Sequence, residues 1–198
     1  MDDKPLRKIR KLRLYNALKL GYLKNKAKQA KRLKRHGYLL DKDLTTDKYM
    51  TAYNPTNGKV IFVSNGTDIT SPMDLITDIA GVGLKRLPST IRYKQDYSAY
   101  LKAKEKYKDA PVTLVGHSLG GGIVTEMVRP EDRAITYNPA NIYQKRKPNV
   151  YSYRIKGDDI SAMSIATKTL ENKAPLVERL NPLQPHGIAN IRDAPIFI

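Results

Sequence analysis

The fold is decided by the stretch Val112-Thr113-Leu114-Val115-Gly116-His117-Ser118-Leu119-Gly120-Gly121-Gly122. An apolar strand pattern runs without a break into a glycine-rich turn, and a helical pattern follows the turn. A G-x-S-x-G motif between a strand and a helix is typical of a nucleophile elbow, in which a serine stands on a strained turn at the carboxyl end of a sheet. Small residues are needed around that serine because the helix folds back closely against the strand. We therefore predict that Ser118 is a nucleophile and that the backbone N–H of Leu119 stabilises a developing oxyanion.

Strand and helix patterns alternate around this stretch. Strands are expected at 49–53, 59–64, 112–115, 134–137 and 150–155, and helices at 72–79, 89–108 and 119–128. The turn-forming cluster Asn54-Pro55-Thr56-Asn57-Gly58 joins the first two strands into a hairpin. This alternation predicts an α/β fold, with a mostly parallel sheet that is covered by helices on both faces.

The N-terminal segment carries most of the positive charge. Residues 1–36 contain fourteen of the 36 lysines and arginines but only two acidic residues, in a chain whose net charge is +17. Apolar residues recur there at spacings of three and four, which predicts a helix with one apolar stripe and a basic opposite face. We divide the chain into a basic helical segment, 1–40, and a catalytic domain, 41–198. The helix either docks on the domain or remains a solvated tail, and its charge favours an anionic membrane surface or nucleic acid.

Composition excludes several other chemistries. The sequence has no cysteine, which rules out disulfides, cysteine nucleophiles and cysteine-ligated metals. No apolar run approaches the roughly 20 residues that cross a bilayer, and the basic N-terminus lacks the apolar region of a secretory signal. An intracellular protein is therefore expected. The sequence does not indicate an oligomeric state.

The elbow Gly116-His117-Ser118-Leu119-Gly120-Gly121 resembles that of the class 3 lipases, the family of the fungal triacylglycerol lipases. Three further segments are similar to family segments in the same order: Ile61 to Asp68, a strand that ends in an R-G-T-like turn; Asp74 to Ala80, a W-x-x-D-like stretch with Asp78 in the acidic place; and Tyr137 to Ala140, a strand that ends in a proline turn. The resemblance covers roughly 49–193 and implies an α/β-hydrolase fold. Asn65 departs from it by replacing the usual arginine, and the usual tryptophan is missing. A compact, cysteine-free member of this kind suits a bacterial or viral source, so the resemblance adds a virion-associated protein as an alternative to an intracellular one.

A nucleophilic serine needs a general base, which must follow it in the chain of an α/β-hydrolase. The sequence has three histidines, and only His186 lies downstream of the elbow. His36 precedes the catalytic domain, and His117, next to the nucleophile, is expected to shape the elbow. Elimination and the family pattern therefore agree on His186 as the base.

Resemblance to the family supplies the remaining site residues. The acid that orients the base should follow the strand at 150–155, where the family frame matches Asp158, whereas Asp159 would need a shift of one residue. The second oxyanion donor is by resemblance the backbone N–H of Thr67, whose hydroxyl could add a third. The predicted triad is Ser118, Asp158 and His186.

These residues predict a carboxylester hydrolase that acts on lipid esters, a lipase or phospholipase, with no metal or organic cofactor. A lipid or membrane surface is the expected partner, and nucleic acid is a further candidate through residues 1–36. An alternative is an interaction protein in which the hydrolase domain is vestigial and the basic arm binds nucleic acid or membranes. An acyltransferase or peptidase on the same fold would use the same triad.

Overall fold

The computed structural model describes residues 9–67, 84–108, 110–140, 147–156, 168–170, 188–192 and 194–198. Its elements are, in chain order, α1 (Leu14–Gly21), α2 (Lys26–Lys34), β1 (Leu39–Asp41), β2 (Tyr49–Tyr53), β3 (Val60–Ser64), the 3-10 helix η1 (Leu84–Ser89), α4 (Ile91–Lys106), β4 (Val112–His117), α5 (Leu119–Met127), β5 (Arg133–Tyr137), β6 (Val150–Ile155), β7 (Lys168–Leu170) and the 3-10 helix η2 (Ile188–Ile191).

The strands form one seven-stranded sheet in which the spatial order, β1 to β7, is the same as the order along the chain. β1, β2 and β3 pair antiparallel, and the hairpin of β2 and β3 aligns Tyr49 with Ser64. From β3 to β7 every pair is parallel. The predicted hairpin and the mostly parallel sheet are therefore confirmed, and the fold is that of an α/β-hydrolase.

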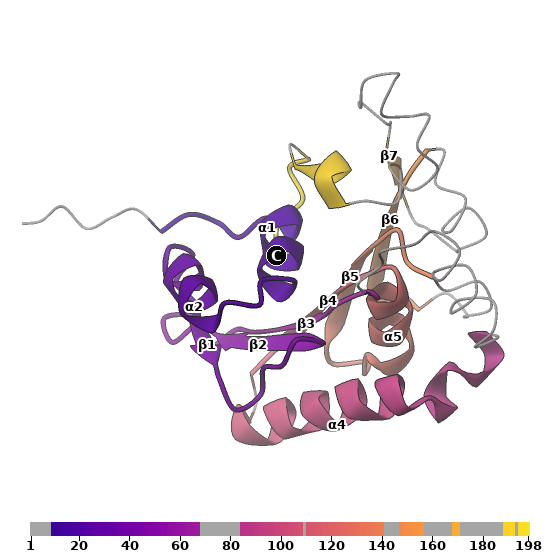
Figure 1. Cartoon of the computed structure of the whole chain (residues 1–198), viewed down its shortest axis with the longest axis horizontal. Helices are drawn as coiled ribbons and strands as arrows, with labels where there is room; N and C mark the ends of the chain where they lie inside the picture. Colours follow the sequence, from indigo (N-terminus) through magenta and orange to yellow (C-terminus); the bar gives the residue numbers. More distant parts are fainter. Residues whose placement is uncertain are drawn as a thin grey trace, which may run out of the picture.

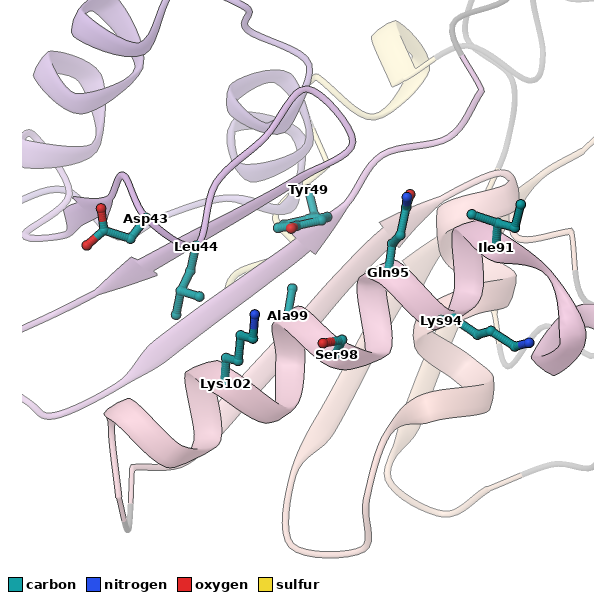
Figure 2. Close-up of a pocket in the computed structure, with 9 residues that line it drawn as sticks. All are labelled: Asp43, Leu44, Tyr49, Ile91, Lys94, Gln95, Ser98, Ala99 and Lys102. Atoms are coloured by element: carbon teal, nitrogen blue, oxygen red, sulfur yellow. The ribbon is translucent and has the colours of Figure 1, made fainter.

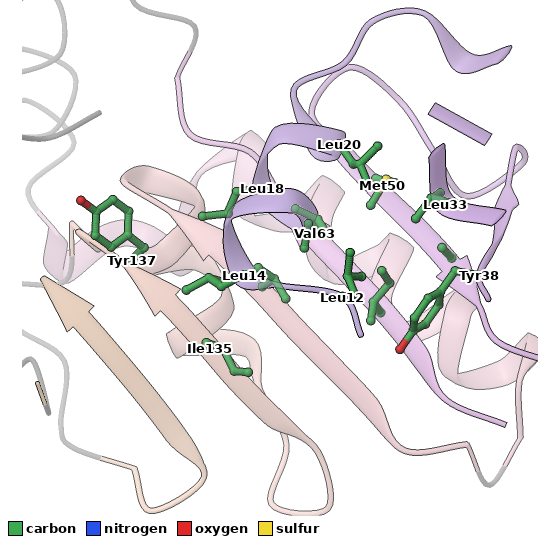
Figure 3. Close-up of a cluster of buried hydrophobic side chains, with 14 of the residues drawn as sticks. Leu12, Leu14, Leu18, Leu20, Leu33, Tyr38, Met50, Val63, Ile135 and Tyr137 are labelled. Carbon is green, nitrogen blue, oxygen red and sulfur yellow. The ribbon is translucent and has the colours of Figure 1, made fainter. Parts of the chain in front are cut away.

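Helices cover both faces of the sheet (Figure 1). On one face α4 and α5 pack over side chains such as Phe62 and Leu114. On the other face α1 and α2 pack over Val63 and Val115, and the leucines of these helices fill the space above the strands (Figure 3). Because both faces are covered, β3 and β4 are buried along their whole length and read as continuous apolar runs.

The N-terminal segment forms two helices rather than the single one that its periodicity predicts. α1 ends at Gly21 and α2 begins after Asn25, whose side chain accepts a hydrogen bond from the backbone N–H of Lys28 at 2.8 Å. This side-chain cap starts a new helix. Residues 23–25 between the two helices are not helical, and Tyr22, just before them, contacts His117.

The two ends of the described chain lie together. Leu14 donates its backbone N–H to the carbonyl of Ile196 at 2.8 Å, and Ile198 donates to Leu12 at 3.0 Å. The side chains of Ile196 and Ile198 pack against the same apolar cluster as α1, and the C-terminus lies beside α1 in Figure 1.

The expected strands and the helices at 89–108 and 119–128 are present with small shifts at their ends. β1 and β7 were not expected from the sequence, and each has three residues. The helix expected at 72–79, and with it the W-x-x-D-like stretch and Asp78, lies outside the described residues.

Candidate active site

Ser118 occupies the strained turn that the sequence predicts. It follows β4 directly and precedes α5, with φ 54° and ψ −127°, a conformation that non-glycine residues rarely adopt. Three backbone hydrogen bonds hold it. Its N–H donates to the carbonyl of Tyr137 at 3.3 Å, and its own carbonyl accepts from Gly122 at 3.1 Å and from Ala140 at 3.0 Å. The elbow and the turn after β5 therefore form one unit.

The glycines of the elbow are required by close approach. A methyl group on Gly120 would stand 2.2 Å from the carbonyl oxygen of Ser64, at the end of β3. Gly66, in the turn after β3, is similarly close to the elbow, because a methyl group on it would lie 3.0 Å from Cβ of Ser118. The elbow and the turn of residues 64–67, which we call the oxyanion turn after its expected role, are thus in direct contact.

Two hydroxyls at this contact are buried without a partner among the described residues. These are Oγ of Ser118, in a residue that is 1% exposed, and Oγ1 of Thr67. Buried hydroxyls normally make hydrogen bonds, and exceptions call for a functional explanation. Leu119 is the first residue of α5, so its backbone N–H has no carbonyl acceptor within the helix. Hydroxyl and N–H groups at a helix N-terminus favour a negative charge.

Residues from several elements hold the oxyanion turn, and none of them was predicted from the sequence. The side-chain amide of Asn65 donates to the carbonyls of Gly21, at 2.9 Å, and Asp47, at 2.8 Å. Arg92 of α4 donates through Nη2 to the carbonyl of Asn65 at 2.9 Å and to that of Lys48 at 2.7 Å. The asparagine that departs from the family pattern is therefore a structural link between the turn and the N-terminal segment.

Arg92 also pairs with a carboxylate in the interior. Asp96 is fully buried, and its oxygens accept from Nε of Arg92 at 2.9 Å and from the hydroxyl of Ser64. Burial raises the pKa of Asp96 above its usual value, and the neighbouring Arg92 and Ser64 offset part of that effect. The pair fixes the end of β3 to α4, immediately before the oxyanion turn.

His117 lies between two tyrosines. Its Nδ1 is 3.0 Å from the hydroxyl of Tyr22, and its ring stacks on Tyr137 with centroids 5.8 Å apart. The hydroxyl of Tyr22 also accepts from the backbone N–H of Gly66 at 2.7 Å. Sequence reasoning missed Tyr22, because one tyrosine among thirteen carries no signal of its own.

Asp158, Asp159 and His186 lie outside the described residues. The structure thus brings together Ser118, Leu119 and the oxyanion turn, and the assignment of acid and base stays a prediction. β6, which precedes the two aspartates, ends at Ile155 beside the elbow unit, where its N–H donates to Oδ1 of Asn138 at 2.9 Å. η2, which follows His186, packs against α1 through Ile191.

A separate hollow of about 400 Å³ lies along α4, where the helix faces β2 and the loop after β1 (Figure 2). It is lined by Asp43, Leu44, Tyr49, Ile91, Lys94, Gln95, Ser98, Ala99 and Lys102. It is open and contains none of the elbow or oxyanion-turn residues. We place the candidate site at Ser118, because a strained backbone meets buried hydroxyls there that have no partner in the described part of the chain.

No family model matches the sequence, and no curated protein matches it. The chain resembles solved fungal lipases. The Lip2 lipase from Yarrowia lipolytica is 17% identical over 78% of this chain and 71% of its own, with a TM-score of 0.42. The mono- and diacylglycerol lipase from Aspergillus oryzae is also 17% identical, over 76% and 74%, with a TM-score of 0.43. A mutant form of MDLA from Penicillium cyclopium is 14% identical over 82% and 78%, with a TM-score of 0.49. These values report a resemblance and assign no residue.

Within the described part of the chain, no helix has the length and apolar character that crossing a membrane requires.

Proposed function

We propose that this protein is a serine hydrolase of lipid carboxylesters, a lipase or phospholipase. The observation that carries the proposal is the elbow itself: Ser118 has a positive φ and a buried hydroxyl without a partner among the described residues, directly against the oxyanion turn. Strain of this kind costs about 1–3 kcal/mol and is retained where function needs it.

In the proposed reaction His186 removes the proton of the Ser118 hydroxyl as Oγ attacks the ester carbonyl, and Asp158 orients the imidazole. The backbone N–H groups of Leu119 and Thr67 stabilise the oxyanion of the tetrahedral intermediate. The C–O ester bond then breaks, and the alcohol leaves with the proton from His186. Water, deprotonated by the same histidine, releases the acyl group as a carboxylic acid and regenerates the serine.

A fluorophosphonate label tests the nucleophile. We expect the label on Ser118 in the folded protein, mapped by mass spectrometry, and no label in Ser118→Ala. Ser98→Ala is a matched control, because Ser98 is exposed on α4 and belongs to neither the elbow nor the oxyanion turn. The Ser98→Ala variant should be labelled like the wild type. A panel of chromogenic esters of rising chain length then measures hydrolysis. Absence of label on Ser118, or full activity of Ser118→Ala, would contradict the proposal.

The triad partners are tested separately. His186→Ala should lower kcat by about 10³-fold or more, and Asp158→Asn by a comparable factor, as in other triads. Asp159→Asn is the matched control for the acid and should retain most activity. If Asp159→Asn is the impaired variant, the acid is one residue further along the chain.

We also propose that the N-terminal segment binds an anionic lipid surface. Lys28, Lys31 and Lys34 project from one face of α2 and are exposed, and residues 9–36 contain no acidic residue. Each basic residue near an anionic bilayer contributes about 1 kcal/mol. Replacing the three lysines with glutamine should therefore weaken sedimentation with phosphatidylserine vesicles about 100-fold. Neutral phosphatidylcholine vesicles are the control. Strong, salt-sensitive binding to duplex DNA without vesicle binding would instead favour the nucleic-acid arm.

A further inference from the structure

One phenol from the N-terminal segment reaches the candidate site. Tyr22 lies between α1 and α2, and its hydroxyl makes two contacts there: it accepts from the backbone N–H of Gly66 at 2.7 Å and lies 3.0 Å from Nδ1 of His117. The rings of Tyr22 and His117 meet edge to face, with centroids 6.1 Å apart. The contact to Gly66 spans 44 residues of the chain, and the contact to His117 spans 95.

These two contacts have a direct bearing on the reacting groups. Gly66 immediately precedes Thr67, the proposed oxyanion donor, and His117 immediately precedes Ser118. A single hydroxyl thus links the oxyanion turn to the elbow. In the tautomer in which Nδ1 of His117 carries no proton, the phenol donates to His117 while it accepts from Gly66, so both hydrogen bonds are satisfied at once.

Close packing around Gly66 restrains the turn between Tyr22 and the elbow. A methyl group on this residue would stand 2.7 Å from the Tyr22 hydroxyl, 3.0 Å from the carbonyl oxygen of His117 and 3.0 Å from Cβ of Ser118. The backbone of the turn is therefore enclosed between Tyr22 and the elbow. Tyr22 is itself fixed, because the adjacent Gly21 accepts from the side chain of Asn65 at 2.9 Å.

We propose that Tyr22 is a positioning residue for the reaction: its hydroxyl sets the distance between the oxyanion turn and Ser118. This inference rests on the proposed function. Oxyanion donors are effective only when they are fixed in advance at the place where charge develops, and a misplacement of about 1 Å can cost about 100-fold in rate. The basic segment thereby contributes to the site in addition to any surface that it binds.

Tyr22→Phe tests the inference, because phenylalanine keeps the ring against His117 and removes only the hydroxyl. We expect kcat to fall about tenfold with little change in KM, since oxyanion stabilisation acts on the transition state and not on the bound ester. The fall is smaller than the 10²–10³-fold that follows loss of a donor itself. The matched control is Tyr15→Phe, which removes a hydroxyl from α1 that contacts Lys19; it should retain the wild-type kcat.

Hydrogen exchange of the Gly66 amide, measured by NMR on the intact protein, reports the contact without reference to activity. Exchange should become at least about tenfold faster in Tyr22→Phe and should not change in Tyr15→Phe, with both variants melting close to the wild type. A purely structural role would lower the melting temperature and leave kcat of the folded enzyme unchanged.

The outcomes separate this inference from the proposed function. If the wild type hydrolyses esters through Ser118 and Tyr22→Phe keeps its kcat, or if Gly66 exchange does not change, the role of Tyr22 is overturned and the proposed function stands. If the wild type shows no Ser118-dependent hydrolysis, the proposed function fails and this role fails with it.

Discussion

At the scale of single residues, Ser118 holds a positive φ on the turn between β4 and α5. Its strain follows from local features, namely a buried strand, a turn of small residues and a helix start, and all of them lie within 112–122. The contacts made by Tyr22 and Arg92 were not predictable in the same way. The hydrogen bond from Arg92 to Asn65 spans 27 positions and the contact of Tyr22 with His117 spans 95, and no local pattern marks either side chain.

The strain at Ser118 predicts a difference in stability between two variants of this residue. Both Ser118→Ala and Ser118→Gly remove the proposed nucleophile, but only glycine adopts φ near 54° without steric cost. We expect Ser118→Gly to be more stable than Ser118→Ala by about 1 kcal/mol, because relief of strain outweighs the greater entropy of glycine in the unfolded chain. Urea denaturation of both proteins measures the difference. Equal stabilities would show that the turn is not strained.

At the scale of elements, side chains near both ends of α4 bind other elements of the fold. Neither of these two attachments was predicted from the sequence. The helix itself was predicted from its pattern. Near its start, Arg92 and Asp96 hold the end of β3 and the oxyanion turn. Near its end, Lys106 and Tyr107 bind Asp41 of β1, at 2.8 Å each. β1 has only three residues, too few to show the alternation that marks a strand. The sequence therefore did not predict that Asp41 would lie next to the end of α4.

The first attachment predicts separate effects on stability and rate. Arg92→Met leaves Asp96 buried without its cation and should cost about 3–5 kcal/mol of stability. The double variant Arg92→Met/Asp96→Leu removes both charges and should recover much of that loss. It should not recover kcat, because the hydrogen bond from Arg92 to the carbonyl of Asn65 stays absent. A double variant with wild-type kcat would show that α4 does not position the oxyanion turn.

The second attachment predicts a dependence on pH. Burial acts to raise the pKa of Asp41, but hydrogen bonds from Lys106, Tyr107 and the backbone of Leu44 outweigh it and lower that pKa below its ordinary value of 3.8. A carboxyl group whose pKa is lower in the folded than in the unfolded state stabilises the fold at pH values above its pKa in the unfolded state. This contribution is lost as the pH falls through the pKa of the folded state. Asp41→Asn should therefore melt below the wild type at pH 7, with the gap narrowing below about pH 4. A gap that is constant from pH 7 to pH 3 would contradict this sign.

At the scale of the whole molecule, the basic segment has two faces with different roles. The sequence predicted its apolar stripe and its basic face, but left open whether it docks. In the structure Leu12, Leu18 and Leu33 are buried against the sheet, while α2 presents its lysines to solvent. The break between α1 and α2 was not predicted, because periodicity continues through Tyr22 and Leu23 while tertiary contacts turn the chain aside. We propose that residues 9–40 fold with the α/β domain and are not a detachable arm.

Deletion and charge replacement distinguish these two faces. Removing residues 1–36 strips buried leucines from one face of the sheet, and each buried leucine contributes about 2 kcal/mol or more, so several of them together approach the whole stability of a domain. We expect the deleted protein to lose cooperative unfolding, measured by circular dichroism on heating. Lys28→Gln/Lys31→Gln/Lys34→Gln should instead melt like the wild type and lose only vesicle binding, because these side chains are exposed. If the deleted protein unfolds cooperatively near the wild-type temperature, the segment is a detachable arm, and a boundary at residue 40 describes the molecule better.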